Sequence, residues 1–516
     1  MPVPQRDGLP DRAELSRPVE GSHPAGWMPG WAGRALLALS LMTLLVVGCS
    51  GVSAATPPLG PRGWAPGALL PWTLSPATVT ALLAGAYVVG GLAVALQLRA
   101  PRRLPAPALA TLALGCLLVM PFGSADHTNY AAYGQIALEG GDPWTVAPNA
   151  WQGGADPVTS GVQPPWQSTP SIYGPLAKLA QLAAAWVGAD NLRQVVWVWQ
   201  VFVVLAWLAT RWLLRRLLSQ RHALIDVLWT ANPLVIATGV LGAHVDTLAT
   251  PLMVAALLVA KRAGWPGALA AGVLAGLATG VKLTAGVVLL ALLLAPLLTR
   301  ESGIGEWVKR AAALVIGAAA VLVPLQVWAG PHSYEQLGRS RRSISLATPW
   351  RWAYEWFGGH LPDATWRSLL FAAAALTCVA LAWAVWRLLT PRARGAAGSP
   401  RDQAALRLTF ALCLAYPVGA PYVLPWYDQL AWALLPAVLA GSGRLPSLVS
   451  AAWLVRGVIL ALAYVPGRVV GLTPAVESFT LGWRTDVAPV GALLVWAAVA
   501  ASRRRTSAIG AAVGTN

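Results

Sequence analysis

Apolar runs recur along almost the whole chain and are separated by short polar segments. A helix that crosses the hydrocarbon core of a bilayer needs about 20 apolar residues, and many of these runs approach that length. Candidate transmembrane helices lie at 35–50, 76–97, 106–122, 195–212, 223–242, 247–260, 265–281, 282–299, 311–329, 366–388, 405–420, 428–441, 446–465 and 487–501. The pattern predicts an all-α polytopic membrane protein with about 13 to 14 transmembrane helices.

The two ends of the chain have a different composition. Residues 1–33 are rich in proline, glycine and charge, which cannot form a hydrophobic core. We predict a disordered cytoplasmic tail there, one transmembrane domain over 34–502 and a second cytoplasmic tail over 503–516. The whole chain is 56% hydrophobic and 11% charged, whereas soluble domains carry roughly 25% charged residues. An ordinary soluble domain is therefore excluded.

The net charge of +17 comes from short basic clusters between the apolar runs. Basic residues favour the cytoplasmic side of a membrane protein, so the clusters indicate orientation. They do not belong to a recognisable nucleic-acid-binding fold. With the N-terminus inside, the clusters at 99–103, 211–222 and 503–505 all fall inside. This topology places the segment 123–194 outside as a large first outer loop, with 175–188 as an interfacial helix.

The first outer loop concentrates acidic and aromatic side chains. Asp126 follows the third apolar run by a few residues. Candidate substrate-binding residues after it are His127, Tyr130, Tyr133, Asp142, Trp144 and Tyr173. Aromatic rings stack on the apolar faces of sugars and carboxylates accept hydrogen bonds from hydroxyl groups, so the loop favours a sugar-binding site. Each feature also has an ordinary explanation: an acid at a helix end can be solvated, and aromatic residues form a belt at membrane interfaces.

A second group of ionisable residues lies in the turn "GAHVDT", between two apolar runs. Ionisable residues at membrane depth are candidates for function, so His244 and Asp246 are predicted to contact substrate. Two alternatives stay open. The side chains can pair with each other, or they can cap the helix that begins near Thr247.

Positive charge occurs at two further places. Lys282 is bracketed by apolar residues near the end of a predicted helix, and Arg339, Arg341 and Arg342 form a cluster that the topology leaves outside. Ammonium and guanidinium groups suit a lipid-linked phosphate. The alternatives are a lysine that snorkels to the interface and a long loop that escapes the charge rule.

Familiar cofactor and metal motifs are missing from the sequence. We find no P-loop, GxGxxG after a strand, HExxH, paired CxxC or GxSxG motif. The four cysteines lie inside apolar runs and fit small buried hydrophobes. The sequence therefore predicts no cofactor and no metal site.

Several separated motifs resemble one known family. The stretches "DHTNYAAYG", "GGDPWTVAP", "STPSIYGPLAKL", "LGAHVDTLATP" and "AGLATGVKLT" occur in this order. They resemble the polyprenol-phosphomannose-dependent α-1,6-mannosyltransferases of actinobacteria, which are GT-C glycosyltransferases. The resemblance is strong over roughly 110–300 and looser to about 490. It departs from the family at Val245, where Asn is usual, and at His127, where an apolar residue is frequent.

The resemblance implies a GT-C-like bundle and an inverting transfer of mannose. The donor would be polyprenyl-phosphate mannose, and the acceptor would be a mannan or lipomannan-type glycolipid on the outer face of the plasma membrane. The acid that begins the first outer loop serves as general base in such enzymes, which implies that role for Asp126. Lys282 and the arginines at 339–342 would then supply positive charge to the phosphate leaving group.

Two other functions are compatible with the residues. A transporter or flippase for a lipid-linked saccharide would also need aromatic and acidic groups beside a membrane cavity. Such proteins usually carry polar residues deep in several helices, whereas here the polar groups gather on one predicted face. A GT-C transferase that uses another polyprenyl-linked sugar is the second alternative.

Overall fold

The computed structural model describes residues 31–218, 220–301, 303–340, 343–389, 399–440 and 446–513. Within these ranges the regular elements are helices and no β-strand occurs, which confirms the predicted all-α class. Seven helices of the described chain are long and apolar enough to cross a membrane, or eight if one bent pair counts as a single span. The chain is therefore a multi-pass membrane protein.

The first part of the chain contains three apolar helices, the 123–191 segment and one long helix. Their bounds are α1 (Ala32–Cys49), α2 (Pro76–Gln97), α3 (Ala106–Leu118), α4 (Asp126–Leu138), η2 (Pro148–Gly154), η3 (Thr159–Gly161), η4 (Trp166–Ser168), α5 (Pro175–Gly188) and α6 (Leu192–Leu217). Side chains cap two of the helices: Ser75 accepts from the Thr78 N–H and Asn191 accepts from the Gln194 N–H. Such caps satisfy backbone donors that a helix leaves free at its first turn.

The middle of the chain forms a broken helix followed by closely connected helices. Their bounds are α7 (His222–Ile225), η5 (Asp226–Thr230), α8 (Pro233–Val235), η6 (Ile236–Leu241), α9 (Asp246–Val259), α10 (Gly264–Val281), η7 (Leu283–Gly286), α11 (Val287–Thr299) and α12 (Ile304–Ala329). The break at 231–232 bends the apolar segment by 41°. Pro233 lacks the N–H that would continue the helix, and Asn232 caps the second half by accepting from the Leu234 N–H.

The last part of the chain alternates short and long helices. Their bounds are η8 (Pro331–Tyr334), α13 (Glu335–Ser340), α14 (Pro349–Phe357), α15 (Asp363–Leu388), α16 (Pro400–Gly419), η9 (Pro425–Asp428), α17 (Gln429–Ala440), α18 (Ser447–Leu462), α19 (Pro474–Gly482), η10 (Trp483–Val487) and α20 (Ala488–Val513). All fourteen predicted segments coincide with helices or broken helices. Helix α20 continues beyond its predicted end through most of the segment 503–516, which the sequence analysis assigned to a tail.

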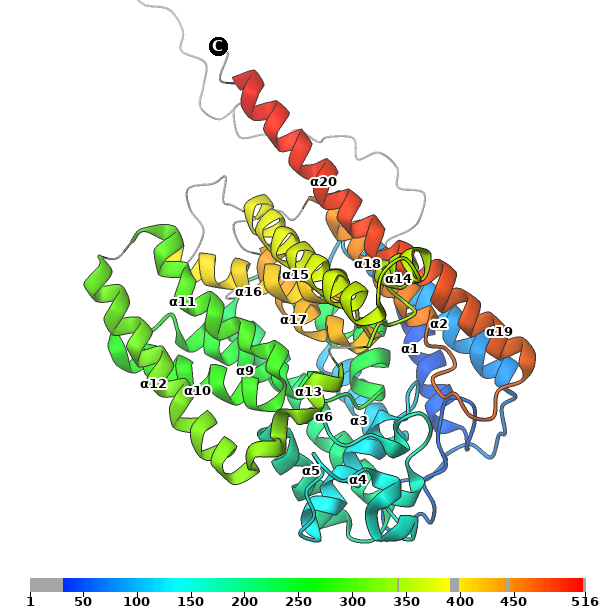
Figure 1. Cartoon of the computed structure of the whole chain (residues 1–516). Helices are drawn as coiled ribbons and strands as arrows, with labels where there is room; N and C mark the ends of the chain where they lie inside the picture. Colours follow the sequence, from blue (N-terminus) through cyan, green and yellow to red (C-terminus); the bar gives the residue numbers. More distant parts are fainter. Residues whose placement is uncertain are drawn as a thin grey trace, which may run out of the picture.

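Small residues let α10 and α12 pack closely side by side (Figure 1). A Cβ on Gly272 would lie 2.2 Å from the Leu314 carbonyl oxygen, and one on Gly317 would lie 2.1 Å from that of Leu269. Glycines four residues apart, such as Gly272 and Gly276, are typical of close helix contacts in membranes. The sequence therefore sets the distance between these two helices.

The region of α4 and α5 lies at one end of the molecule, and the C-terminal end of α20 projects from the opposite end (Figure 1). Helix α4 packs against both α5 and α6. Its Gly134 permits this, because a Cβ there would lie 2.2 Å from the Gln181 carbonyl oxygen. This packing fixes the first residue of α4, Asp126, relative to the helices that follow.

Candidate functional site

Asp126 is the first residue of α4 and is 6% exposed. Helix α4 contains many polar residues, yet nearly all of its side chains from Asp126 to Ile136 are buried. The Asp126 N–H donates to Ser124 Oγ at 3.0 Å, which fixes the start of the helix. The acid is thus held inside protein and not on a solvated loop.

A histidine and a tyrosine lie beside the Asp126 carboxylate. His244 Nδ1 is 3.6 Å from Asp126 Oδ2 and 3.4 Å from the Tyr130 hydroxyl. The Tyr173 hydroxyl donates to that of Tyr130 at 3.5 Å. The structure therefore brings four of the predicted residues together from three parts of the chain, at 126–130, 173 and 244.

His244 is held by a ring stack from the C-terminal half of the chain. Its imidazole lies on the Trp426 indole with ring centroids 3.6 Å apart and an interplanar angle of 11°. Trp426 also meets Tyr464 edge-on at 6.0 Å. These three rings, with Tyr87 and Gly123, line a cavity of about 10 Å³, which is room for about one water molecule.

Asp246 and Lys282 form a buried ion pair beside this group. Lys282 Nζ lies 2.5 Å from Asp246 Oδ1 and 3.9 Å from the centre of the Tyr427 ring. The pair joins the two open ends of the α9–α10 hairpin. Neither alternative for the turn is found, because His244 and Asp246 do not pair with each other and neither side chain caps α9. Asp246 pairs with Lys282, and His244 lies against Asp126. Asp246 Oδ2 has no hydrogen-bond partner within the described residues.

Burial dominates the electrostatics of the site. It raises the pKa of the Asp126 carboxyl to about 7, an increase that the positive charge of Lys282 opposes and the negative charge of Asp246 reinforces. Burial lowers the pKa of His127 to about 3, and the charge of Arg468 adds to that decrease. Burial also holds the pKa of His244 well below 6.5, and His127 and Lys282 lower it further. Both imidazoles are therefore neutral at neutral pH.

Three other predicted residues of the first loop make contacts within the loop itself. The Tyr133 hydroxyl donates to the Thr169 carbonyl oxygen at 2.8 Å. Asp142 Oδ1 accepts from the Trp144 N–H at 3.0 Å, and the buried Trp144 indole donates to the Tyr173 carbonyl oxygen at 2.8 Å. These contacts shape the loop around Tyr173. Their predicted contacts with sugar remain predictions.

For the remaining predicted residues, no hydrogen bond or ion pair with the group around Asp126 is found within the described side chains. His127 is fully buried, and neither of its ring nitrogens has a hydrogen-bond partner within the described part of the chain. The backbone of Arg339 lies in α13, but its side chain is not among those described. Arg341 and Arg342 lie outside the described residues. The predicted phosphate-binding role of the cluster therefore stays a prediction.

The residues named from the sequence include none from the C-terminal wall of the site. This wall consists of Trp426, Tyr427, Tyr464 and Arg484, whose guanidinium carbon lies 4.2 Å from the centre of the Tyr464 ring. The stretch "PYVLPWYDQ" at 421–429 was a usable signal, since it places aromatic residues and an acid between two apolar runs. Arg484 carried no comparable signal.

A second cavity, of about 60 Å³, lies next to Lys282 and is mainly apolar. Its lining residues are Thr284, Val287, Leu412, Cys413, Tyr416, Tyr427 and Leu430. Tyr427 belongs both to this cavity and to the contact with Lys282. Within the described residues, no three His, Cys, Asp or Glu side chains form a group suited to a metal ion.

The arrangement is suited to proton transfer. A buried carboxylate with a pKa near 7 can accept a proton at neutral pH, and Asp126 is fixed by its helix and by neutral neighbours that cannot protonate it. The positive charge of Lys282 acts on Asp126, and the apolar cavity adjoins Lys282 through Tyr427. The site therefore combines a carboxyl group suited to accept a proton with a nearby cation and an apolar cavity.

Comparison with known proteins points in the same direction. A family model described as "Alpha-(1->6)-mannopyranosyltransferase, N-terminal domain" matches residues 28–300. The match includes Asp126, His244, Asp246 and Lys282 and ends before the C-terminal wall. A protein of Mycolicibacterium smegmatis with the name "Probable alpha-(1->6)-mannopyranosyltransferase" is 30% identical over 150 residues. That similarity covers 28% of this chain and 27% of the relative's length.

Proposed function

Because the chain belongs to the alpha-(1->6)-mannopyranosyltransferase family, we propose that it is an inverting membrane mannosyltransferase. It transfers mannose from polyprenyl-phosphate mannose to a mannan or lipomannan-type glycolipid, with α-1,6 linkage. The observation that carries this proposal is the Asp126 carboxyl, buried at the start of α4 with a pKa raised to about 7. Its environment is that of a general base.

The proposed reaction is a direct displacement at the anomeric carbon of the donor. A hydroxyl oxygen of the acceptor forms the new C–O bond, while the bond between that carbon and the phosphate oxygen breaks. The electron pair of the broken bond stays on the phosphate, which leaves as polyprenyl phosphate. The hydroxyl proton passes to the Asp126 carboxylate. One displacement inverts a β-linked mannosyl phosphate to an α-mannoside.

Two features support a lipid-linked donor. The apolar cavity of about 60 Å³ adjoins Lys282 through Tyr427, so an isoprenoid chain and a phosphate would find matching surroundings next to each other. An ammonium group has three donors, and Lys282 keeps N–H groups for a phosphate oxygen while it is bonded to Asp246. The unpartnered Asp246 Oδ2 is suited to accept from a sugar hydroxyl.

The orientation of the protein is part of the proposal. Basic clusters favour the inner side, and the α4–α5 region lies at the end opposite to the C-terminal end of α20 (Figure 1). With the arginines at 503–505 inside, this arrangement supports an active site on the outer face of the plasma membrane. A lipid-linked donor would then present its sugar to water while its tail stays in the bilayer.

The test is mannose transfer by membranes that contain wild type, Asp126→Asn or the control Asp190→Asn. The donor is polyprenyl-phosphate mannose, the acceptor is a short α-1,6-mannoside, and an α-1,6-specific mannosidase identifies the product. Asp190 is an exposed acid of the same segment. We expect Asp126→Asn to transfer at least about 100-fold more slowly, as loss of a general base implies, while Asp190→Asn matches wild type.

Equal rates for wild type and Asp126→Asn, at equal amounts in the membrane, would show that Asp126 is not the base. A wild-type protein that transfers no mannose between these substrates would overturn the proposed donor or acceptor.

A further inference from the structure

The proposed leaving group creates a demand for positive charge that Lys282 alone does not meet. A phosphate monoester carries about 1.5 to 2 negative charges at neutral pH. Lys282 is already paired with the buried Asp246 carboxylate at 2.5 Å, so the pair adds little net charge to the site. A second cation should therefore face the same region.

Arg484 has the geometry of such a cation. Its Nε donates to the Ala463 carbonyl oxygen at 2.8 Å, and its guanidinium carbon lies over the Tyr464 ring. The residue is half-buried, and it forms no ion pair with a carboxylate within the described chain. The Nη groups of the guanidinium stay available for a bidentate contact with an anion.

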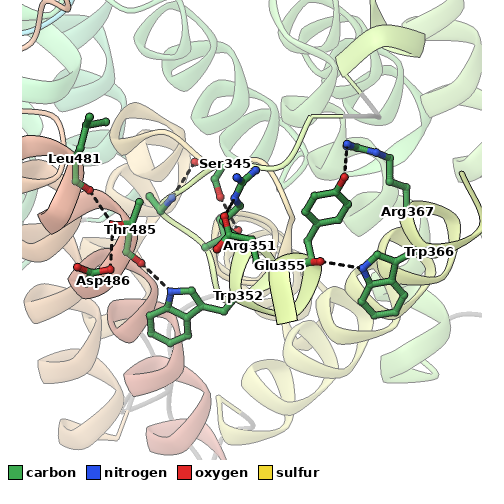
Figure 2. Close-up of polar contacts among 12 residues, drawn as sticks. Ser345, Arg351, Trp352, Glu355, Trp366, Arg367, Leu481, Thr485 and Asp486 are labelled. Atoms are coloured by element: carbon green, nitrogen blue, oxygen red, sulfur yellow. Dashed lines mark hydrogen bonds and ion pairs between the residues drawn. The ribbon is translucent and has the colours of Figure 1, made fainter. Parts of the chain in front are cut away.

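The nearest acid in the sequence is engaged elsewhere. Asp486 Oδ1 accepts from the Thr485 hydroxyl at 3.0 Å, and the Thr485 carbonyl oxygen accepts from the Trp352 indole at 2.8 Å, as Figure 2 shows. Helix α14, which carries Trp352, thus holds the turn that carries Arg484. Arg484 is positioned by its neighbours without being neutralised by them.

Arg484 is linked to the proposed base through a continuous series of ring contacts. Tyr464 lies under the guanidinium, Trp426 meets Tyr464 at 6.0 Å, and His244 stacks on Trp426 at 3.6 Å. His244 in turn is 3.6 Å from Asp126. The series runs along the wall of the cavity of about 10 Å³.

Tyr422 lies within electrostatic reach of both ends of this series. Burial raises the pKa of its hydroxyl, the charge of Asp126 adds to the increase, and the charge of Arg484 opposes it. The proposed base and the guanidinium therefore both act electrostatically on the same side chain.

The backbone around Arg484 is also unusual. Residues Trp483–Val487 form a π-helical turn between α19 and α20. Such turns are rare in proteins, and those that occur often lie at functional sites. The Trp483 indole donates to the Ile459 carbonyl oxygen at 3.0 Å, so the turn is fixed on α18 as well as on α14.

We propose that Arg484 binds the phosphate of a lipid-linked donor and stabilises the negative charge of the leaving polyprenyl phosphate. This role rests on the proposed function, but the anion site itself can be tested without catalysis. The arginine lies beyond the residues matched by the family model, so the role is assigned from its contacts in this chain.

The test is ligand-induced thermal stabilisation of the full-length protein in detergent. Wild type, Arg484→Gln, Arg484→Lys and the control Arg351→Gln are each mixed with a polyprenyl monophosphate, with the uncharged polyprenol of equal length, or with inorganic phosphate. Arg351 is a matched surface arginine that pairs with Glu355 on α14. We expect the lipid phosphate to bind wild type and Arg351→Gln at least about tenfold more tightly than it binds Arg484→Gln.

Arg484→Lys keeps the charge and should retain part of the affinity, which separates a phosphate contact from a general loss of structure. Equal preference for lipid phosphate over polyprenol in Arg484→Gln and wild type would overturn the proposal. Stabilisation by inorganic phosphate alone, lost in Arg484→Gln, would support the anion site and overturn its assignment to a lipid.

Mannose transfer supplies a separate readout. Arg484→Gln should raise KM for the donor and leave KM for the α-1,6-mannoside acceptor unchanged. If wild type binds the lipid phosphate through Arg484 but transfers no mannose, the anion site stands and the proposed transfer fails. If Asp126→Asn abolishes transfer while Arg484→Gln leaves the donor KM unchanged, the proposed transfer stands and the proposed role of Arg484 fails.

Discussion

Lys282 Nζ and Asp246 Oδ1 lie 2.5 Å apart and join the two open ends of the α9–α10 hairpin. The Asp246 side chain is 1% exposed and that of Lys282 is 13% exposed. A charge in such surroundings needs a partner, because water no longer compensates it. The pair explains how two oppositely charged side chains that the sequence offered as separate substrate contacts can both lie inside the protein.

The first prediction concerns this pair. Lys282→Met should destabilise the protein by about 3 to 5 kcal/mol, because Asp246 is left as an unpaired buried charge. The double variant Lys282→Met/Asp246→Asn should recover most of that loss. Thermal unfolding of the purified variants in detergent measures both effects. A double variant as unstable as the single one would show that the lysine stabilises the fold through contacts other than the ion pair.

The second prediction is an acidic limit in the pH dependence of transfer. The base must be ionised, so kcat/KM should rise with pH and level off above the Asp126 pKa of about 7. Asp246→Asn removes a negative charge that raises this pKa, so its profile should move toward lower pH. Initial rates across a pH series at low donor concentration test the shift. A profile that is flat from pH 5 to 8 would contradict this role for Asp126.

The third prediction is that the proposed base costs stability. The folded-state pKa of Asp126 is raised above its ordinary 3.8, so its stabilising effect is complete below pH 3.8 and is lost as the pH rises to about 7. Asn cannot ionise. The Tm of Asp126→Asn minus that of wild type should therefore be larger at pH 8 than at pH 5. A difference that is the same at both values would show that the carboxyl is not desolvated as the structure indicates.

The fourth prediction concerns the contact between α10 and α12. Gly317→Val should lower stability by about 1 to 3 kcal/mol or more, because the added atoms would meet the Leu269 carbonyl oxygen. Gly305→Val lies on the same helix, where a Cβ meets no atom within 4 Å, and serves as the control. Thermal unfolding and membrane yield should fall for the first variant and stay near wild type for the second.

The hydrophobic pattern was sufficient to locate the apolar helices, because the length of an apolar run is set by the bilayer and not by distant contacts. It predicted about 13 to 14 membrane spans, whereas seven or eight helices of the described chain are long and apolar enough to cross a bilayer. The same criterion missed α4. This helix has no apolar face to detect, since protein and not lipid surrounds it on all sides from Asp126 to Ile136. A buried polar helix therefore looks like a loop in the sequence.

The proposed site was predictable in part for a similar reason. Asp126, His244 and Lys282 stand out because ionisable residues are costly near apolar runs. Their partners do not stand out. Trp426 is one of 27 tryptophans, and its stack on His244 depends on how η9 approaches the turn between η6 and α9 in space. The proposed role of Arg484 likewise rests on its having no ion-pair partner within the described residues, which the sequence does not reveal.

The stack of His244 on Trp426 also limits how this protein can be divided. The histidine lies within the residues that the family model matches, whereas the tryptophan lies more than one hundred positions beyond them. A chimaera that exchanged the first 300 residues for those of a relative would place a foreign histidine against this loop. A boundary placed at residue 300 would therefore separate residues that line the same cavity. A chimaera should exchange residues 421–428 together with the N-terminal half.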